Sequence, residues 1–124
     1  MKKLFSFLTC SALAIAASAQ TPKIIVQGSG APAVYTSFAT AVAAATATDI
    51  VYLSGGTFDL ANVDVYIDHE VHIVGAGIHP DSASITLPTR LTNGVVHFML
   101  PGSNYTVTGV AFPGGIRFGD NNGA

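Results

Sequence analysis

The stretch that decides the fold reads VHIVGAG and spans Val71–Gly77. Its first half alternates large apolar residues with smaller or polar ones, which is typical of a short strand with one buried face. The glycines in its second half predict a tight bend. Similar stretches, Ile50–Gly56 and Tyr105–Gly109, lie before and after it. A strand followed by glycine at a period of 20–34 residues predicts the rungs of one stacked solenoid.

Each rung is expected to contain three short strands. The predicted strands are 51–53, 57–60 and 63–68 in the first rung, 71–74, 84–87 and 95–99 in the second, and 105–107, 110–112 and 116–118 in the third. In the first rung Val63, Val65 and Ile67 should point inward. A longer loop is expected over Pro88–Gly94, carrying Arg90.

Strands in successive rungs should pair in parallel, so that inward residues form columns. The expected columns are Val51/Val71/Tyr105, Leu53/Ile73/Val107 and Phe58/Ile85/Phe112. A flat antiparallel sandwich is the rival, because short strands with turn signals also fit that architecture. We favour the solenoid, since glycine follows the same alternating triplet each time.

One helix is expected, over Ser37–Ala45, after a short strand at Lys23–Val26 and a connector at Ala31–Ala33. Ser37 can cap its N-terminus, and alanine is the best helix former. Its apolar face is small and suits a lid over one end of the stack; a surface helix without a capping role is the alternative. The residues expected to form the cap and the stack are Phe38, Val42, Val51, Leu53, Phe58, Val71, Ile73, Gly75, Gly77, Val107, Gly109 and Phe112.

The first 19 residues have the pattern of an export signal. A basic pair, Lys2-Lys3, precedes an apolar run, and Ala17-Ser18-Ala19 predicts cleavage before Gln20. The run is too short to span a bilayer, which needs about 20 apolar residues. Cys10, the one cysteine, lies inside this leader, so disulfides are not expected in the mature chain. The predicted organisation is a leader over 1–19, a strand and capping helix over 20–48, and rungs over 49–124.

The charge balance limits the partners that can be expected. The whole chain has a net charge of −2, and removal of the leader with its two lysines leaves −4. Only Lys23, Arg90 and Arg117 remain as cations, so nucleic acid and anionic lipid are poor partners. No cofactor is expected.

The capping and strand motifs resemble the N-terminal end of the right-handed parallel β-helix proteins of the pectin-lyase-like superfamily. The matching positions are Phe38, Ala41, Ala45, Asp49, Val51-Tyr52-Leu53, Gly56-Thr57-Phe58, Val71–Gly77 and Asn104–Phe112. This resemblance implies an all-β, right-handed parallel β-helix with a short capping helix, present here as an N-terminal fragment. Enzymes of this superfamily have many rungs and place catalytic residues on the middle ones. No residue of this chain matches such an active-site motif, so the resemblance implies a fold and no reaction.

The densest polar cluster consists of Asp64, Asp68, Glu70 and His72, which alternation places on the outer face near one turn. A hard cation such as calcium could use the carboxylates. No spaced metal-binding loop is present, however, so we favour a solvated outer face and expect no metal. The remaining histidines follow no metal spacing either. His69 and His79 are expected in turns, and His97 is expected beside a core strand, partly buried and hydrogen-bonded.

These observations favour a secreted or cell-surface β-helix that serves as a structural, adhesive or carbohydrate-binding module. Expected partners are a polysaccharide or another surface protein, and self-association through the last rung. One alternative is the N-terminal part of a polysaccharide lyase or glycoside hydrolase whose active site lies on further rungs. Another is a truncated product without function. Enzymatic activity of this chain alone is not expected, because no nucleophile–base pair or carboxylate pair can be identified.

Overall fold

The computed structural model describes residues 21–78, 87–99 and 104–119 of the chain. The strands are β1 (Ile24–Gln27), β2 (Ala33–Tyr35), β3 (Ile50–Leu53), β4 (Gly56–Asp59), β5 (Val65–Ile67), β6 (Val71–Val74), β7 (Thr89–Thr92), β8 (Val96–Phe98), β9 (Tyr105–Thr108), β10 (Val110–Ala111) and β11 (Ile116–Phe118), and the helix is α1 (Phe38–Ala44). The predicted leader with Cys10 lies outside these residues, as does His79.

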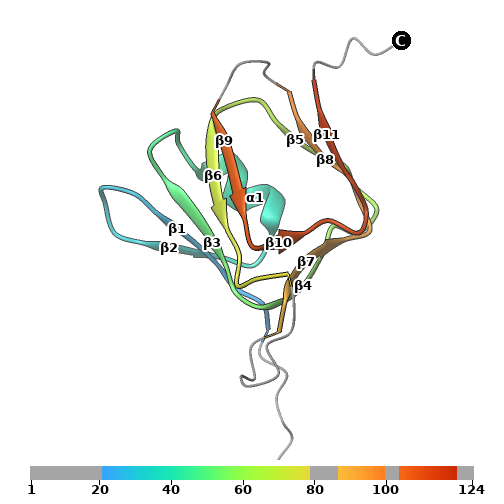
Figure 1. The fold of residues 1–124 in the computed structure, drawn as a ribbon. Coiled ribbons are helices and arrows are strands. Elements are labelled where there is room, and N and C mark those ends of the chain that lie inside the picture. Colours follow the sequence, from blue (N-terminus) through green and yellow to red (C-terminus); the bar gives the residue numbers. More distant parts are fainter. Residues whose placement is uncertain (1–20, 79–86, 100–103, 120–124) are drawn as a thin grey trace, which may run out of the picture.

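The strands wind into a coil of three sheets, which Figure 1 views approximately down the axis of the coil. The first sheet has the order β2-β1-β3-β6-β9, the second β10-β7-β4 and the third β11-β8-β5. Each turn of the coil contributes one strand to each sheet. We call β3-β4-β5 rung 1, β6-β7-β8 rung 2 and β9-β10-β11 rung 3. All pairs between rungs are parallel, which confirms the predicted parallel β-helix and excludes the antiparallel sandwich.

The register between rungs 1 and 2 differs from the sequence prediction by two residues. Val51 pairs with Ile73, whereas the expected partner was Val71. The register between rungs 2 and 3 agrees with the prediction, since Val71 pairs with Tyr105 and Ile73 with Val107. A slip of two residues keeps every side chain on its own face of the sheet, so alternation alone cannot detect it.

The second strand of rung 2 lies later in the chain than predicted. Residues Thr89–Thr92 form β7, so the expected loop over Pro88–Gly94 is wrong, and Leu91 takes the place beside Phe58 that was assigned to Ile85. Ile85 itself lies outside the described residues. The inward Thr89 is fully buried. Its hydroxyl accepts a hydrogen bond from the Ala76 N–H (2.8 Å) and donates one to the Ser54 carbonyl (3.0 Å). These bonds satisfy a polar side chain that was expected in a loop and lies in the core instead.

The glycine bends stack on each other between rungs 2 and 3. The Gly75 N–H donates to the Thr108 carbonyl at 2.8 Å, and the Gly77 N–H to the Gly109 carbonyl at 3.0 Å. A side chain at Gly75 would collide with the Gly109 carbonyl oxygen, and Gly109 itself has φ +67°. Both positions therefore need glycine, the first for close approach and the second for its left-handed backbone.

Helix α1 covers the interior of the coil at the rung 1 end, behind the strands in Figure 1. Ser37 is its N-cap, and its hydroxyl accepts a hydrogen bond from the Thr40 N–H. Phe38, Ala41 and Val42 are buried. None of the helical structure in the described residues has the length and apolar character that crossing a membrane requires.

The segment before the helix adds a feature that the sequence did not predict. β1 pairs antiparallel with β3, and β2 pairs antiparallel with β1, so this hairpin extends the first sheet beyond rung 1. β2 includes Ala33, the last residue of the expected connector.

Candidate functional site

The four outer-face candidates do not gather into one cluster. Asp64 lies just before β5, and its carboxylate reaches across to rung 2. Asp68 and Glu70 lie in the turn between β5 and β6, and His72 lies in β6. Asp68 contacts His69, while Glu70 pairs with His72 across 3.7 Å. Within the described residues no group of three or more His, Cys, Asp or Glu side chains could hold a metal ion.

A ladder of outward side chains crosses the third sheet, with one member from each rung. Tyr66, His97 and Arg117 occupy paired positions of β5, β8 and β11. The rings of Tyr66 and His97 are stacked, with centroids 4.5 Å apart and planes 18° from parallel. Tyr66 remains 51% exposed, whereas only 9% of His97 is exposed. We call Tyr66, His97 and Arg117 the outer ladder.

Asp64 holds the ring of His97, the middle residue of the outer ladder, by a hydrogen bond. One carboxylate oxygen accepts a hydrogen bond from the Val95 N–H, and the other accepts one from His97 Nε2, both at 3.1 Å. Since an ionised carboxylate only accepts, the Nε2 atom must carry a proton. The Val95 N–H, and after it the His97 ring, hold the pKa of Asp64 below its usual 3.8. The carboxylate is therefore charged at neutral pH.

The outer ladder combines three kinds of binding group on one exposed face. Tyr66 offers an amphipathic ring and a hydroxyl, and Arg117 offers a guanidinium fork of donors. Asp64, which lies beside the ladder and contacts His97, adds acceptor oxygens. The spacing of the ladder residues follows the separation of about 4.8 Å between neighbouring strands. Asp64 was expected on the outer face and His97 beside the core, but their contact was not predicted, because it depends on the register between rungs.

The second histidine site is on the first sheet. His72 Nδ1 lies 2.6 Å from the Thr106 hydroxyl of the neighbouring strand β9, and its Nε2 faces Glu70. This contact joins rungs 2 and 3 on the outside of the coil. The predicted candidates Glu70 and His72 thus contact each other, and His72 also links β6 to β9 through Thr106.

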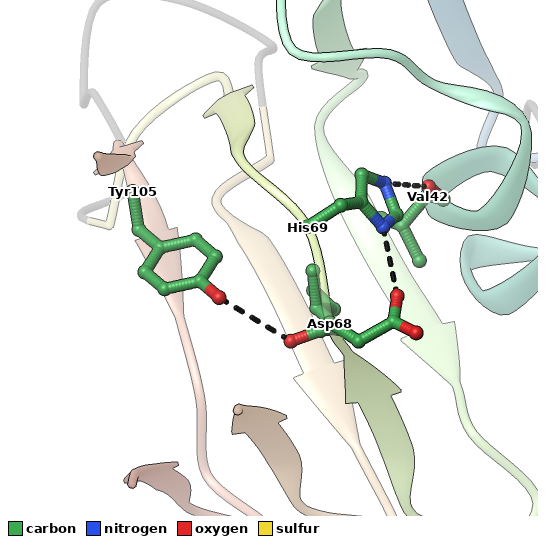
Figure 2. A network of polar contacts seen from close by, with 5 residues as sticks. Val42, Asp68, His69 and Tyr105 are labelled. Carbon is green, nitrogen blue, oxygen red and sulfur yellow. Dashed lines mark hydrogen bonds and ion pairs between the residues drawn. The ribbon is translucent and has the colours of Figure 1, made fainter. Parts of the chain in front are cut away.

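The third histidine, His69, lies in the turn between β5 and β6, as expected. Figure 2 shows its ring between the Val42 carbonyl of α1 and the Asp68 carboxylate. The same view shows the Tyr105 hydroxyl, from rung 3, directed at the main chain beside Asp68, where it donates to the Ile67 carbonyl. These contacts connect the lid helix, rung 1 and rung 3 at one corner of the coil.

A shallow hollow lies apart from these sites, between the β1–β2 loop and the end of α1. Its lining includes Gly28, Ser29, Ala44, Thr46 and Asp49. The Asp49 carboxylate accepts a hydrogen bond from the Thr46 N–H at 2.8 Å, so it serves the turn after the helix.

The fold and the outer face define the class of this protein: it is a parallel β-solenoid with a helical lid. No protein-family model, curated protein or solved structure matches the chain.

Proposed function

We propose that this protein is an exported β-helix module of the pectin-lyase-like type, which binds a polysaccharide on the outer face of its third sheet. The order of lid helix, strand, glycine bend and stacked rungs supports the type of β-helix. The leader pattern at residues 1–19 supports export. The outer ladder of Tyr66, His97 and Arg117 is the observation that carries the binding proposal.

Saccharides present hydroxyl groups along their edges and apolar C–H groups on their faces. A surface that binds them therefore needs donors, acceptors and an exposed ring close together. Tyr66 supplies the ring, Arg117 the donors and Asp64 the acceptors. Arg117 can also bind the carboxylate of an acidic sugar with two parallel hydrogen bonds. An extended chain suits this face, since each rung contributes one group to the ladder.

The scarcity of cations on this face favours a polysaccharide over nucleic acid as the partner. The expected mature chain has a net charge of −4, and an acidic side chain, Asp64, contacts His97 of the outer ladder. A phosphate backbone would require several cations on one face.

Binding of the chain from Gln20 onward to immobilised polygalacturonate and to a neutral β-glucan tests the proposal. Tyr66→Ala should weaken binding to both polymers at least tenfold, because the exposed ring is lost. Arg117→Ala should weaken binding to polygalacturonate alone, since the guanidinium pairs with its carboxylates. Tyr52→Ala is the matched control, because Tyr52 is a similarly exposed tyrosine on the first sheet (38% exposed). Absence of binding to any glycan tested, or equal losses for Tyr66→Ala and Tyr52→Ala, would contradict the proposal.

Export has its own test. Mass spectrometry of the protein recovered outside the expressing cell should find Gln20 at the N-terminus. An intact Met1 in that fraction would rule out removal of the leader.

A further inference from the structure

The residues at the start of strand β9 form a motif for covalent modification. Asn104, Tyr105 and Thr106 read Asn-x-Thr, with a residue other than proline in the middle. In secreted proteins this pattern is the acceptor for N-linked glycans. It occurs once in the chain, because no other asparagine is followed two residues later by serine or threonine. In an exported chain, Asn104 is therefore the candidate acceptor.

Asn104 lies where the fold can accommodate a bulky group. It is exposed and directly precedes β9, at the end of the coil opposite the lid helix (Figure 1). Side chains alternate along an extended chain, so Tyr105 packs against the core whereas Asn104 and Thr106 are exposed. A glycan on the Asn104 amide would thus extend into solvent and displace no core side chain.

The hydroxyl of the motif is engaged in the folded protein. Thr106 pairs with His72 of β6, and its hydroxyl lies 2.6 Å from the His72 Nδ1 atom. A transferase that recognises this hydroxyl must therefore act before β9 pairs with β6. The two residues are 34 positions apart in the sequence, and pairing across such separations is slow compared with local folding. Transfer is thus expected during export, the stage to which the leader pattern at residues 1–19 directs the chain.

We propose that Asn104 is an N-glycosylation site whose glycan covers the edge of rung 3. This inference rests on the proposed export, because the donor and the transferase meet the chain only on the export route. The donor is an oligosaccharide carried on a polyprenyl diphosphate. The side-chain nitrogen of Asn104 forms a bond to the anomeric carbon of the first sugar and loses one proton. The bond between that carbon and the diphosphate oxygen breaks, and the polyprenyl diphosphate leaves.

The position of Asn104 gives the glycan a physical role. Among the described strands, β9 is the last of the first sheet, so its outer backbone groups have no neighbouring strand. Tyr105 and Val107 of this strand are only partly buried. An open edge beside apolar side chains favours pairing with another chain. A bulky, hydrophilic glycan at the start of β9 would keep a second chain away from this edge.

Secretion from a eukaryotic cell tests the site. The chain from Gln20 onward is placed behind a leader that the host is known to cleave, so the result does not depend on residues 1–19. The secreted protein should exceed the mass of its polypeptide by one oligosaccharide, and a peptide N-glycosidase should remove this mass and convert Asn104 to aspartate. Asn104→Gln and Thr106→Ala should each lose the glycan, whereas Thr106→Ser should retain it. Thr108→Ala is the matched control, an exposed threonine of β9 outside the motif, and should also retain it.

Sedimentation velocity tests the role of the glycan. The glycosylated chain should stay monomeric at micromolar concentrations at which the same protein associates after enzymatic removal of the glycan. A secreted chain without a glycan on Asn104 would overturn the proposal, as would a glycosylated chain that associates as strongly as the treated one. The native leader is tested separately in the same host with the full chain. Its failure to direct secretion would count against the proposed export, whereas the occupancy of Asn104 behind the foreign leader decides the modification site.

Discussion

Phe118 stacks on Phe98, with ring centroids 5.1 Å apart and planes 16° from parallel, yet the two rings differ greatly in burial. Phe98 is 1% exposed and Phe118 is 68% exposed. Both belong to one inward column of the third sheet, in which Ile67 is the fully buried first member. Among the described strands, β9, β10 and β11 are each the last of their sheets. Rung 3 therefore presents apolar side chains and open strand edges together.

We predict that the isolated chain from Gln20 to Ala124 associates through rung 3, because open edges and apolar side chains favour pairing with another chain. Sedimentation velocity should show species larger than a monomer at micromolar concentrations. Phe118→Ser should shift this distribution toward monomer, whereas Tyr52→Ser, on an outer face, should leave it unchanged. A wild-type chain that stays monomeric across this range, with a cooperative melt above about 60 °C, would contradict the prediction.

The buried hydroxyl of Thr89 gives a second prediction. Thr89→Val keeps the shape of the side chain but leaves the Ala76 N–H and the Ser54 carbonyl without their partner. The free energy of unfolding should fall by about 1–3 kcal/mol, the cost of buried groups left unpaired. Thr57→Val, at an exposed position of β4, is the matched control. Equal stability of the two variants in urea denaturation would show that the hydrogen bonds of the Thr89 hydroxyl to Ala76 and Ser54 do not stabilise the fold.

The lid helix gives a third prediction. Phe38 is 3% exposed, and its replacement by alanine should lower the free energy of unfolding by about 3–5 kcal/mol. Thr40→Ala, at an exposed position of the same helix, should change stability little. Denaturant melts of both variants measure the difference. If Phe38→Ala costs no more than Thr40→Ala, the helix is not a lid.

Acid should destabilise the protein through three carboxylates. The pKa values of Asp59, Asp64 and Asp68 are lowered, chiefly by hydrogen bonds from the Ala61 N–H, the Val95 N–H and the His69 ring respectively. Their contribution to stability is present above the usual 3.8 and is lost as pH falls through the lowered values. The melting temperature should therefore drop below about pH 4, and Asp64→Asn should make that drop shallower. An unchanged pH profile in Asp64→Asn would exclude this carboxylate as a source of the acid sensitivity.

The sequence predicted the architecture well because its signals are local. Ser37 before an alanine-rich segment predicts the start of a helix, and Gly75 after an alternating strand predicts a bend. The face on which each residue lies also follows from alternation. The register between rungs does not follow from alternation, because pairing Val51 with Val71 or with Ile73 buries the same face of the sheet.

The candidate site was harder to predict, because its contacts join rungs. Asp64 was expected on the outer face, but its partners Val95 and His97 follow only from the pairing of β5 with β8. The strand β7 was missed because the stretch between Pro88 and Gly94 was interpreted as a loop, and its most buried inward residue, Thr89, is polar. Threonine's preference for strands was the available signal.

The register between the rungs is the central claim, because the coil and the outer ladder both depend on it. Disulfide formation in the chain from Gln20 onward, which has no native cysteine, measures it directly. Tyr52 and Val74 are paired neighbours on the outer face of the first sheet, so Tyr52→Cys with Val74→Cys should oxidise readily. Tyr52→Cys with His72→Cys represents the register that the sequence suggested, and its cysteines should lie about 8 Å apart, too far to bond. Rapid oxidation of the first pair alone is the predicted result. Preferential oxidation of the second pair, or of neither, would contradict the structure.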